Sequence, residues 1–256
     1  MSSVAAADAP AIPITFINLD EDAARRERIG AEFDRLGLTA ARLAATRWTR
    51  LSPEEQQHYY SDALNARTYF RPLVAGEKGC YASHIRAWRA LLDSANAACV
   101  VLEDDVGLRD DFASVVSAIA ALPPDWDMVK LIGRDNEKLR SSRPLVGDYR
   151  LVHYRRVPSL TAGYVVSRGG AAKLLASRVP FGRPIDVDLR HWWECGDGLR
   201  IAGVVPAAIT LDDTSFQRSI GAKADDPGLA RQWRKFSHKL HYSVHNALAS
   251  ARIPPP

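Results

Sequence analysis

The sequence predicts an α/β fold in which a largely parallel, mixed sheet is flanked by helices on both faces. From residue 12 onward, apolar runs of strand length alternate with amphipathic segments of helix length. This alternation is typical of sheets built from strand–helix units. The 256 residues are 46% hydrophobic and 25% charged, which suits one large domain with a buried core and excludes a disordered chain, a collagen or a coiled coil.

The first strand and helix are predicted within residues 12–36. The run IPITFINL at 12–19 is short, apolar and rich in β-branched residues, so it predicts a buried strand. Asp20 is expected to cap a helix that begins with two acidic residues, and Gly37 to end it just after its last turn. Residues 43–45 are predicted to form a second short strand.

A capping box marks the next helix. Ser52 and Glu55 stand three residues apart, with Pro53 at the first helical position, and this combination predicts a short helix. Residues 61–76 have no clear period and are expected to be irregular. A stripe of apolar residues at helical spacing then predicts a helix over residues 77–94.

The rest of the domain continues the alternation. The predicted strands are 99–102, 128–132, 151–157, 161–167 and 201–205, of which the last is expected to complete the sheet. The predicted helices are 112–122 and 170–176.

Charge is unevenly distributed along the chain. The formal net charge is +4, and residues 216–256 hold seven basic and two acidic residues, so this end carries +5 and the remainder −1. We therefore expect a flexible N-terminus at 1–11, a domain at 12–215 and a basic extension at 216–256. A nearly neutral body without a recognised DNA- or RNA-binding motif argues against a nucleic-acid partner.

The sequence also predicts a cellular location. The three cysteines are far apart and form no CxxC pair, and the first residues lack the basic region of a secretory signal. No apolar run approaches the ~18 residues that a membrane helix needs. A cytoplasmic protein, peripheral on the inner membrane if its basic end binds lipid, is the expectation.

An acidic segment directly follows the predicted strand at 99–102. In open α/β sheets, ligands bind outside the carboxyl ends of the strands, which is where Glu103, Asp104 and Asp105 stand. Residues at positions i and i+2 of an extended segment point to the same side, so Glu103 and Asp105 are candidates to share one ligand. Such oxygen donors suit Mg²⁺ or Mn²⁺. The alternative is that Asp104 and Asp105 cap the following loop and face water.

Five blocks of the sequence resemble glycosyltransferase family 25, the lipopolysaccharide-biosynthesis group that also includes the collagen galactosyltransferases. The blocks are FINLDEDAARRERI at 16–29, GEKGCYASHIRAW at 76–88, CVVLEDDV at 99–106, AGYVVSRGGAAKLL at 162–175 and PIDVDL at 184–189. They occur in the order found in that family. The second and third blocks together are the most specific part of the resemblance.

The resemblance implies a GT-A-like, nucleotide-sugar-binding fold and an inverting transfer of a hexose, often galactose, from a UDP-sugar to a glycan such as lipopolysaccharide or lipooligosaccharide. Glu103, Asp104 and Asp105 would hold the divalent cation, Mn²⁺ or Mg²⁺, that bridges the diphosphate. A metal ion neutralises the charge that develops on the leaving group, so this implication agrees with the physical argument for the acidic segment.

An inverting displacement also needs a base that accepts the proton of the acceptor hydroxyl. Asp186 and Asp188, in the PIDVDL block, are the candidates, and a helix N-cap is the structural alternative for each. The remaining matched positions are candidates for donor binding, together with Glu103 and Asp104. They are Asn18, Arg26, Glu77, Ser83, His84, Gly163 and Tyr164.

For several of these positions a structural role competes. His84 is interpreted either as part of the donor pocket or as a buried hydrogen-bonding residue, and Gly163 and Tyr164 either approach the sugar or pack in the core. Arg25 and Arg28 are expected to form a solvated helix face, and Cys80 to be a packed thiol.

The basic segment at 231–242 predicts an amphipathic helix. Trp233, Phe236 and Leu240 recur at helical spacing among basic residues, a pattern typical of helices that lie on anionic lipid. The alternative is a helix docked on the domain with a solvated basic face.

Two further functions stay open at the level of the sequence. A non-catalytic carbohydrate- or nucleotide-binding protein would use the same acidic residues without turnover. A metal-dependent hydrolase would release sugar or phosphate without an acceptor.

Overall fold

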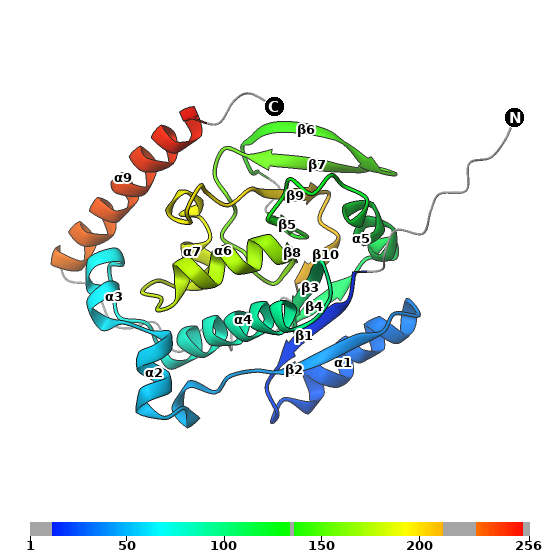
Figure 1. The fold of residues 1–256 in the computed structure, drawn as a ribbon, viewed down its shortest axis with the longest axis horizontal. Coiled ribbons are helices and arrows are strands. Elements are labelled where there is room, and N and C mark those ends of the chain that lie inside the picture. Colours follow the sequence, from blue (N-terminus) through cyan, green and yellow to red (C-terminus); the bar gives the residue numbers. More distant parts are fainter. Residues whose placement is uncertain (1–11, 134–135, 212–228, 253–256) are drawn as a thin grey trace, which may run out of the picture.

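The computed structural model describes residues 12–133, 136–211 and 229–252, and of these the side chains at 229–231 and 252 are not described. The predicted N-terminus at 1–11 lies outside the described residues. An eight-stranded sheet runs through the centre of the molecule and helices cover both of its faces (Figure 1). The strands follow the order β2–β1–β3–β8–β5–β9–β7–β6. Their bounds are β1 Ile14–Asn18, β2 Ala40–Ala44, β3 Ala98–Glu103, β5 Met128–Lys130, β6 Leu139–Val146, β7 Tyr149–Tyr154, β8 Gly163–Ser167 and β9 Ile201–Val205.

The strand directions confirm the predicted mixed α/β sheet. β1 pairs in parallel with β2 and β3, and β5 in parallel with β9, whereas the other four neighbouring pairs are antiparallel. These pairings make β7 and β8 run opposite to the other six strands of the sheet. The carboxyl ends of β1, β2 and β3 therefore meet at one edge, where ligands bind in sheets of this kind.

Helices pack against the two faces through alternating strand residues. α4 (Ala75–Asp93) and α6 (Arg168–Arg178) cover one face, where Trp88 packs in the same cluster as Val101. α1 (Ala23–Arg35) and α5 (Phe112–Ala120) cover the other face, with Val100 in their cluster. Neighbouring residues of β3 thus enter opposite cores, as the period of a strand requires.

The residues that cap the first two helices match the prediction at all but one position. The cap of α1 is Asp22 and not Asp20, because the Asp22 carboxylate accepts a hydrogen bond from the backbone N–H of Arg25. Gly37 has φ +63°, a conformation that favours glycine, and it follows the end of this helix. The predicted capping box at Ser52 is present at the start of α2 (Pro53–Tyr59).

The expectation of an irregular segment at 61–76 is wrong. α3 (Asp62–Thr68) forms there, and polar contacts hold it in place of an apolar stripe. The buried amide of Asn65 donates to the carbonyl oxygens of Gly182 at 2.7 Å and Arg71 at 3.0 Å. Hydrophobic periodicity carries no signal for a helix of this kind.

Three strands are absent from the prediction. β6 is a partly exposed edge strand, and β4 (Val106–Leu108) pairs with β10 (Ile209–Leu211) in a separate two-stranded sheet, so the strand at 201–205 is not the last. The short elements η1 (Trp48–Arg50), α7 (Ile185–Asp188) and η2 (Trp192–Glu194) complete the domain.

The basic end of the chain forms α9 (Leu229–Arg252), a longer helix than the predicted segment. It docks on the domain through Tyr242 and Asn246, both buried. The Asn246 amide donates to the Arg155 carbonyl oxygen at 2.9 Å and accepts a hydrogen bond from the Trp192 indole at 3.3 Å. Within the described part of the chain, no helix has the combined length and hydropathy needed to cross a bilayer.

Candidate active site

A cleft of about 900 Å³ opens at the carboxyl ends of β1, β2 and β3. Its walls come from the segments that follow these three strands, from the first turns of α1 and α4, and from α7. Asn18, Glu103 and Asp186 all line it, although they are far apart in the sequence. The edge of the sheet predicted to carry the site is therefore the edge that carries the cleft.

The three acidic residues after β3 have three different environments. Asp104 is directed toward α1, where its carboxylate accepts hydrogen bonds from the Asn18 amide at 2.7 Å and the Arg25 guanidinium at 3.2 Å. Both of its oxygens are thus engaged by the protein. These contacts make Asp104 the residue that fixes the acidic segment against α1, and its role as a metal ligand stays a prediction.

The arginines of α1 also differ from the expectation. Arg25 and Arg28 line the cleft, and the Arg28 guanidinium donates to the Asp104 carbonyl oxygen at 3.3 Å. They therefore do not form a solvated face. Arg26 is exposed and is not among the described residues that line the cleft. A shift of one residue on a helix turns a side chain by about 100°, which decides which arginine reaches the site.

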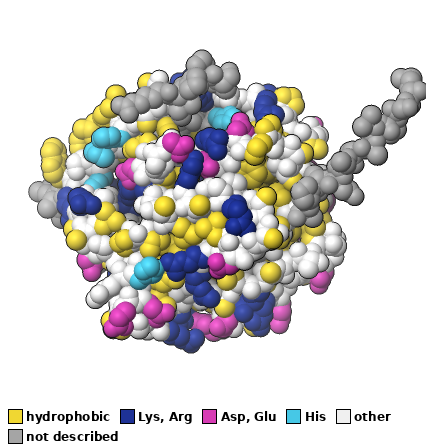
Figure 2. Space-filling model, in the orientation of Figure 1, with side chains coloured by type: hydrophobic (Ala, Val, Ile, Leu, Met, Phe, Trp, Pro, Cys, Tyr) yellow, Lys and Arg dark blue, Asp and Glu magenta, His cyan; other side chains and the backbone are white. Residues whose placement is uncertain are grey.

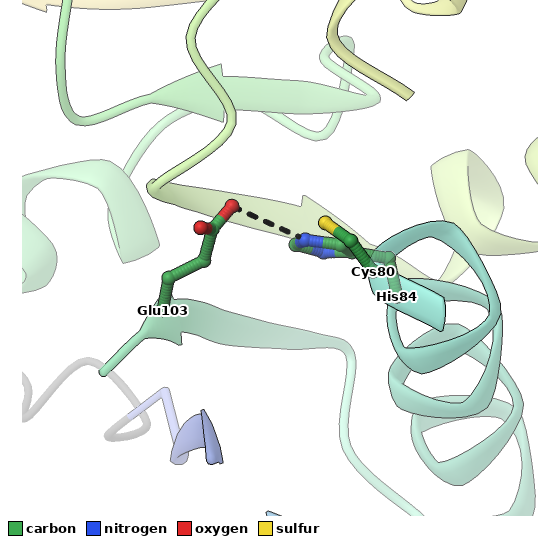
Figure 3. Close-up of side chains that lie close together, drawn as sticks. All are labelled: Cys80, His84 and Glu103. Atoms are coloured by element: carbon green, nitrogen blue, oxygen red, sulfur yellow. Dashed lines mark ion pairs between the residues drawn. The ribbon is translucent and has the colours of Figure 1, made fainter. Parts of the chain in front are cut away.

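A chain of polar contacts holds Glu103 in the cleft. The Trp88 indole donates to the Tyr164 hydroxyl at 2.9 Å, and that hydroxyl lies 2.8 Å from His84 Nδ1. Because the indole can only donate, the Tyr164 proton is available to His84 Nδ1, and the neutral ring then carries its own proton on Nε2. This nitrogen lies 3.5 Å from a carboxylate oxygen of Glu103 (Figure 3). His84 is thus a positioning residue for Glu103.

Glu103 remains half-buried, with its side chain 29% exposed. Thr161 also donates to it at 3.3 Å, and the contacts with His84 and Thr161 outweigh burial and lower the pKa of the Glu103 carboxyl. The ligand atoms of Cys80, His84 and Glu103 all lie within 4.8 Å of one another. Figure 3 shows these three side chains grouped together. Burial raises the pKa of the Cys80 thiol well above its usual value, and a protonated thiol beside a histidine is a poor ligand set for a hard cation.

Asp105 is the acidic residue that fits a cation best. It lines the cleft, and its Oδ1 atom is buried without a hydrogen-bond partner. Burial and the neighbouring Glu103 carboxylate raise the pKa of Asp105 to about 6. A divalent ion between Glu103 and Asp105 would replace the repulsion between the two carboxylates by attraction and so lower the pKa of Asp105.

The two aspartates of α7 also have different environments. Asp186 lines the cleft and is half-buried, and desolvation raises the pKa of its carboxyl to about 6. Asp188 lies behind it with only 3% of its side chain exposed. It pairs with Arg183 at 2.8 Å and accepts a hydrogen bond from the Tyr81 hydroxyl at 2.6 Å. This contradicts the expectation that Asp188 is a catalytic base, because its carboxylate is already committed to the protein.

The start of α4 is held close to the loop after β2. A Cβ on Gly79 would lie 2.4 Å from the Thr46 carbonyl oxygen, so only glycine allows this approach. The Ser83 hydroxyl accepts a hydrogen bond from the Thr46 backbone N–H at 2.7 Å. Glu77 caps the helix by accepting from the Val74 backbone N–H at 3.0 Å and is clamped by Arg71. Glu77 and Ser83 thus line the cleft while they serve the backbone.

Two predicted donor-binding residues lie in the core and not in the cleft. A Cβ on Gly163 would lie 2.3 Å from the Ile209 side chain, so this glycine allows β8 to pack against β10. Tyr164 is 1% exposed and acts through His84.

Lys130 is a charged residue near the cleft that sequence reasoning missed. It is 1% exposed at the end of β5, and its ammonium donates to the carbonyl oxygen of Leu160, which lines the cleft. Burial lowers the pKa of Lys130 to about 8 despite the field of Asp186. A lysine inside the apolar run MVKLI was the available signal, because lysine is almost never fully buried without a role.

Together these features define an α/β protein with an acidic ligand cleft at the carboxyl ends of its first strands. The sequence profile of glycosyltransferase family 25 (LPS biosynthesis protein) matches residues 11–189. The chain belongs to this family, which confirms the resemblance seen in the motif blocks.

Named relatives agree with this assignment. The chain is 31% identical over 122 residues to procollagen galactosyltransferase 2 of Homo sapiens, a match that covers 46% of this chain and 19% of that protein. It is 29% identical over 185 residues to a glycosyltransferase 25 family member of Aedes aegypti, which covers 68% of this chain and 29% of that protein. A Drosophila melanogaster family member is 30% identical over 181 residues, again covering 68% and 29%. The chain thus spans less than a third of the length of these relatives.

Proposed function

We propose that this protein is an inverting, divalent-cation-dependent transferase that moves a hexose, galactose in the first instance, from a UDP-sugar to a hydroxyl of a glycan. One observation carries the proposal. Asp105 and Asp186, both with a pKa raised to about 6, face one cleft at the carboxyl ends of the parallel strands. Galactose is preferred because a relative is a procollagen galactosyltransferase, and lipopolysaccharide or lipooligosaccharide is the acceptor proposed from the family description.

Asp186 is the proposed general base. In the reaction, the acceptor oxygen forms a bond to the anomeric carbon as the bond from that carbon to the diphosphate oxygen breaks, and the hydroxyl proton passes to the Asp186 carboxylate. A half-buried carboxylate with a pKa of about 6 is a stronger base than an exposed one yet is mostly ionised at pH 7. None of the described ion pairs involves Asp186, which leaves it open to substrate.

Glu103 and Asp105 are the proposed ligands of the cation. When bound, Mn²⁺ or Mg²⁺ would stabilise negative charge on the diphosphate. Asp104, fixed by Asn18 and Arg25, sets the position of the segment that carries both ligands. His84 positions Glu103 through the 3.5 Å contact between its Nε2 atom and the Glu103 carboxylate.

The donor diphosphate is proposed to lie between α1 and the start of α4. Arg25 and Arg28 line the cleft on the α1 side. Ala75 and Gly76 line it at the N-terminus of the 19-residue helix α4, where backbone N–H groups and the helix dipole favour anions.

A thermal-shift panel tests the donor class. UDP-, GDP- and CMP-sugars are each supplied with Mn²⁺, with Mg²⁺ and with EDTA. A UDP-sugar at 100 times its Kd stabilises the fold by ~2.7 kcal/mol, and EDTA should remove most of that shift. Transfer is then measured with the bound donor and a glycan acceptor. Free sugar released without an acceptor would identify a hydrolase, and binding without turnover a non-catalytic protein.

A matched pair of variants tests the cation site. Asp105→Asn should weaken Mn²⁺-dependent UDP binding by more than about tenfold, because it removes a proposed ligand. Asp104→Asn keeps an oxygen for Asn18 and should reduce binding less, by moving the segment rather than removing a ligand. Equal losses in both variants, measured by titration calorimetry, would remove the distinction between ligand and positioning residue. The cytoplasmic location stays a prediction that cell fractionation can check.

A further inference from the structure

The outward face of α9 carries a continuous apolar stripe. Its members recur every three or four residues and are 47% to 71% exposed. They are Trp233, Phe236, Leu240, Val244 and Leu248. Residues at this spacing share one face of a helix. Figure 2 shows hydrophobic, histidine and basic side chains together at the left margin of the molecule, where Figure 1 places α9.

This stripe is not the surface by which α9 docks on the domain. Docking uses the opposite face, where Tyr242 packs against His191 and Trp193 with ring centroids 5.2 and 5.5 Å apart, and where Asn246 is buried. The helix is thus held at its inner face and leaves five large apolar side chains on the outside. A solvated helix face would instead carry polar residues.

A basic groove of about 850 Å³ borders one long side of the stripe. It lies between α9 and the segment around β6 and β7, and four cationic side chains line it against one acidic residue, Glu137. The cations are Lys138, Arg140, Arg155 and Arg156. On the α9 side the groove is lined by Ser243, Ala247 and Ser250, which stand next to Val244 and Leu248 on the helix surface.

We propose that the apolar stripe of α9 and this groove form a surface that binds an anionic lipid bilayer, with the stripe in the acyl–headgroup boundary and lipid phosphates at the groove. Charge complementarity selects this occupant. Residues 229–252 contain no aspartate or glutamate, and the groove adds four cations. A second copy of the same face would bring like charges together, whereas an anionic bilayer satisfies both the apolar and the basic parts. The inference stands independently of the proposed function.

Vesicle flotation of the full chain tests the proposal. We expect binding to phosphatidylcholine vesicles that contain about one third phosphatidylglycerol, weak binding to pure phosphatidylcholine, and a fall in binding at high salt. The double variant Trp233→Ser with Leu240→Ser should lose most of the binding. Arg155→Gln should weaken it about fivefold, the equivalent of about 1 kcal/mol per cation near an anionic surface.

Two matched controls distinguish the proposed surface from a general loss. Val205→Ser removes an exposed apolar residue from the end of β9, and Arg109→Gln removes an exposed cation after β4, away from α9. Both should bind as the unchanged protein does, and circular dichroism should show the same helix content in all variants.

Three results would overturn the proposal. These are no binding to anionic vesicles at low salt, equal binding of the Trp233 and Leu240 double variant, and equal binding to neutral vesicles. A concentration-dependent dimer that the double variant abolishes would also overturn it, by assigning the stripe to a second copy. Since none of these measurements uses a sugar donor, their failure leaves the proposed transferase untouched.

Discussion

Two neighbouring regions handle buried acidic groups in opposite ways. In the cleft, none of the described ion pairs involves Asp105 or Asp186, and desolvation raises the pKa of both carboxyls to about 6. In the arginine cluster behind it, formed by Arg178, Arg183, Asp188 and Glu194, each carboxylate pairs with guanidinium groups. There the arginines lower the pKa of Glu194 to about 2 in spite of burial. Asp186 and Asp188, two residues apart on α7, belong one to each region.

The comparison teaches that burial alone does not identify a reactive carboxylate. Asp188 is the more buried of the two, yet its charge is neutralised by the protein and its remaining contacts stabilise the fold. The described residues do not neutralise Asp186 and Asp105 in this way, so these carboxylates can accept a proton from a substrate or bind a cation. The position of the charged partners therefore decides which of two adjacent acids is available for chemistry.

The largest expected effect is on catalysis at Asp186. Asp186→Asn should lower the transfer rate by about 10²- to 10⁴-fold, because general-base catalysis is worth that factor. The melting temperature and the Kd of the UDP-sugar should change little. In the unchanged protein the rate should rise with pH through about 6, as the carboxyl loses its proton. Retention of the full rate in a folded Asp186→Asn variant would place the base elsewhere.

The matching change in the arginine cluster should act on stability instead. Asp188→Asn leaves Arg178 and Arg183 with less negative charge in a buried site. Removing one partner of a buried ion pair costs about 3–5 kcal/mol. Urea unfolding should show this loss, while any protein that remains folded should keep its KM for the donor. A variant with normal stability and no turnover would make Asp188, and not Asp186, the catalytic residue.

We expect acid to lower the free energy of unfolding through His191 before it protonates the carboxylates of the arginine cluster. Burial lowers the pKa of His191 to about 4 from 6.5. As pH falls from about 6.5 to 4, the unfolded chain takes up a proton that the folded protein does not, so the free energy of unfolding should fall by up to about 3 kcal/mol. His191→Asn should flatten this slope in urea titrations. An unchanged slope would mean that other groups carry the pH dependence.

The smallest effects are expected from two tyrosines that serve the two regions. Tyr81→Phe removes the 2.6 Å hydrogen bond to Asp188 and should lower the free energy of unfolding by about 1.5–3 kcal/mol without a change in donor affinity. Tyr164→Phe removes the contact that fixes His84 and should in addition lower the transfer rate. Calorimetry and donor titration on both variants compare them. Identical behaviour of the pair would show that His84 does not position Glu103.

Local sequence patterns determined most of the elements. The apolar run at 12–19, the capping box at Ser52 and the stripe at 77–94 each predicted an element that the structure contains, because they act over a few residues. The acidic segment after β3 was also placed at the correct edge of the sheet, since strand carboxyl ends are where such ligand sites lie. Hydrophobic periodicity did not predict α3, because the buried amide of Asn65 and not an apolar stripe holds this helix.

Only the tertiary structure decided which residue of each motif does what. Asp104 is held by Asn18, 86 positions away, and Asp188 accepts a hydrogen bond from Tyr81, 107 positions away. Neither partner can be read from spacing, because the pairings join elements that meet only when the sheet has formed. The sequence determined the family, the fold class and the edge of the sheet. The hydrogen bonds and ion pairs of the folded chain separated groups that stabilise the fold from groups left open to a ligand, since electrostatic interactions depend on distances of a few ångströms.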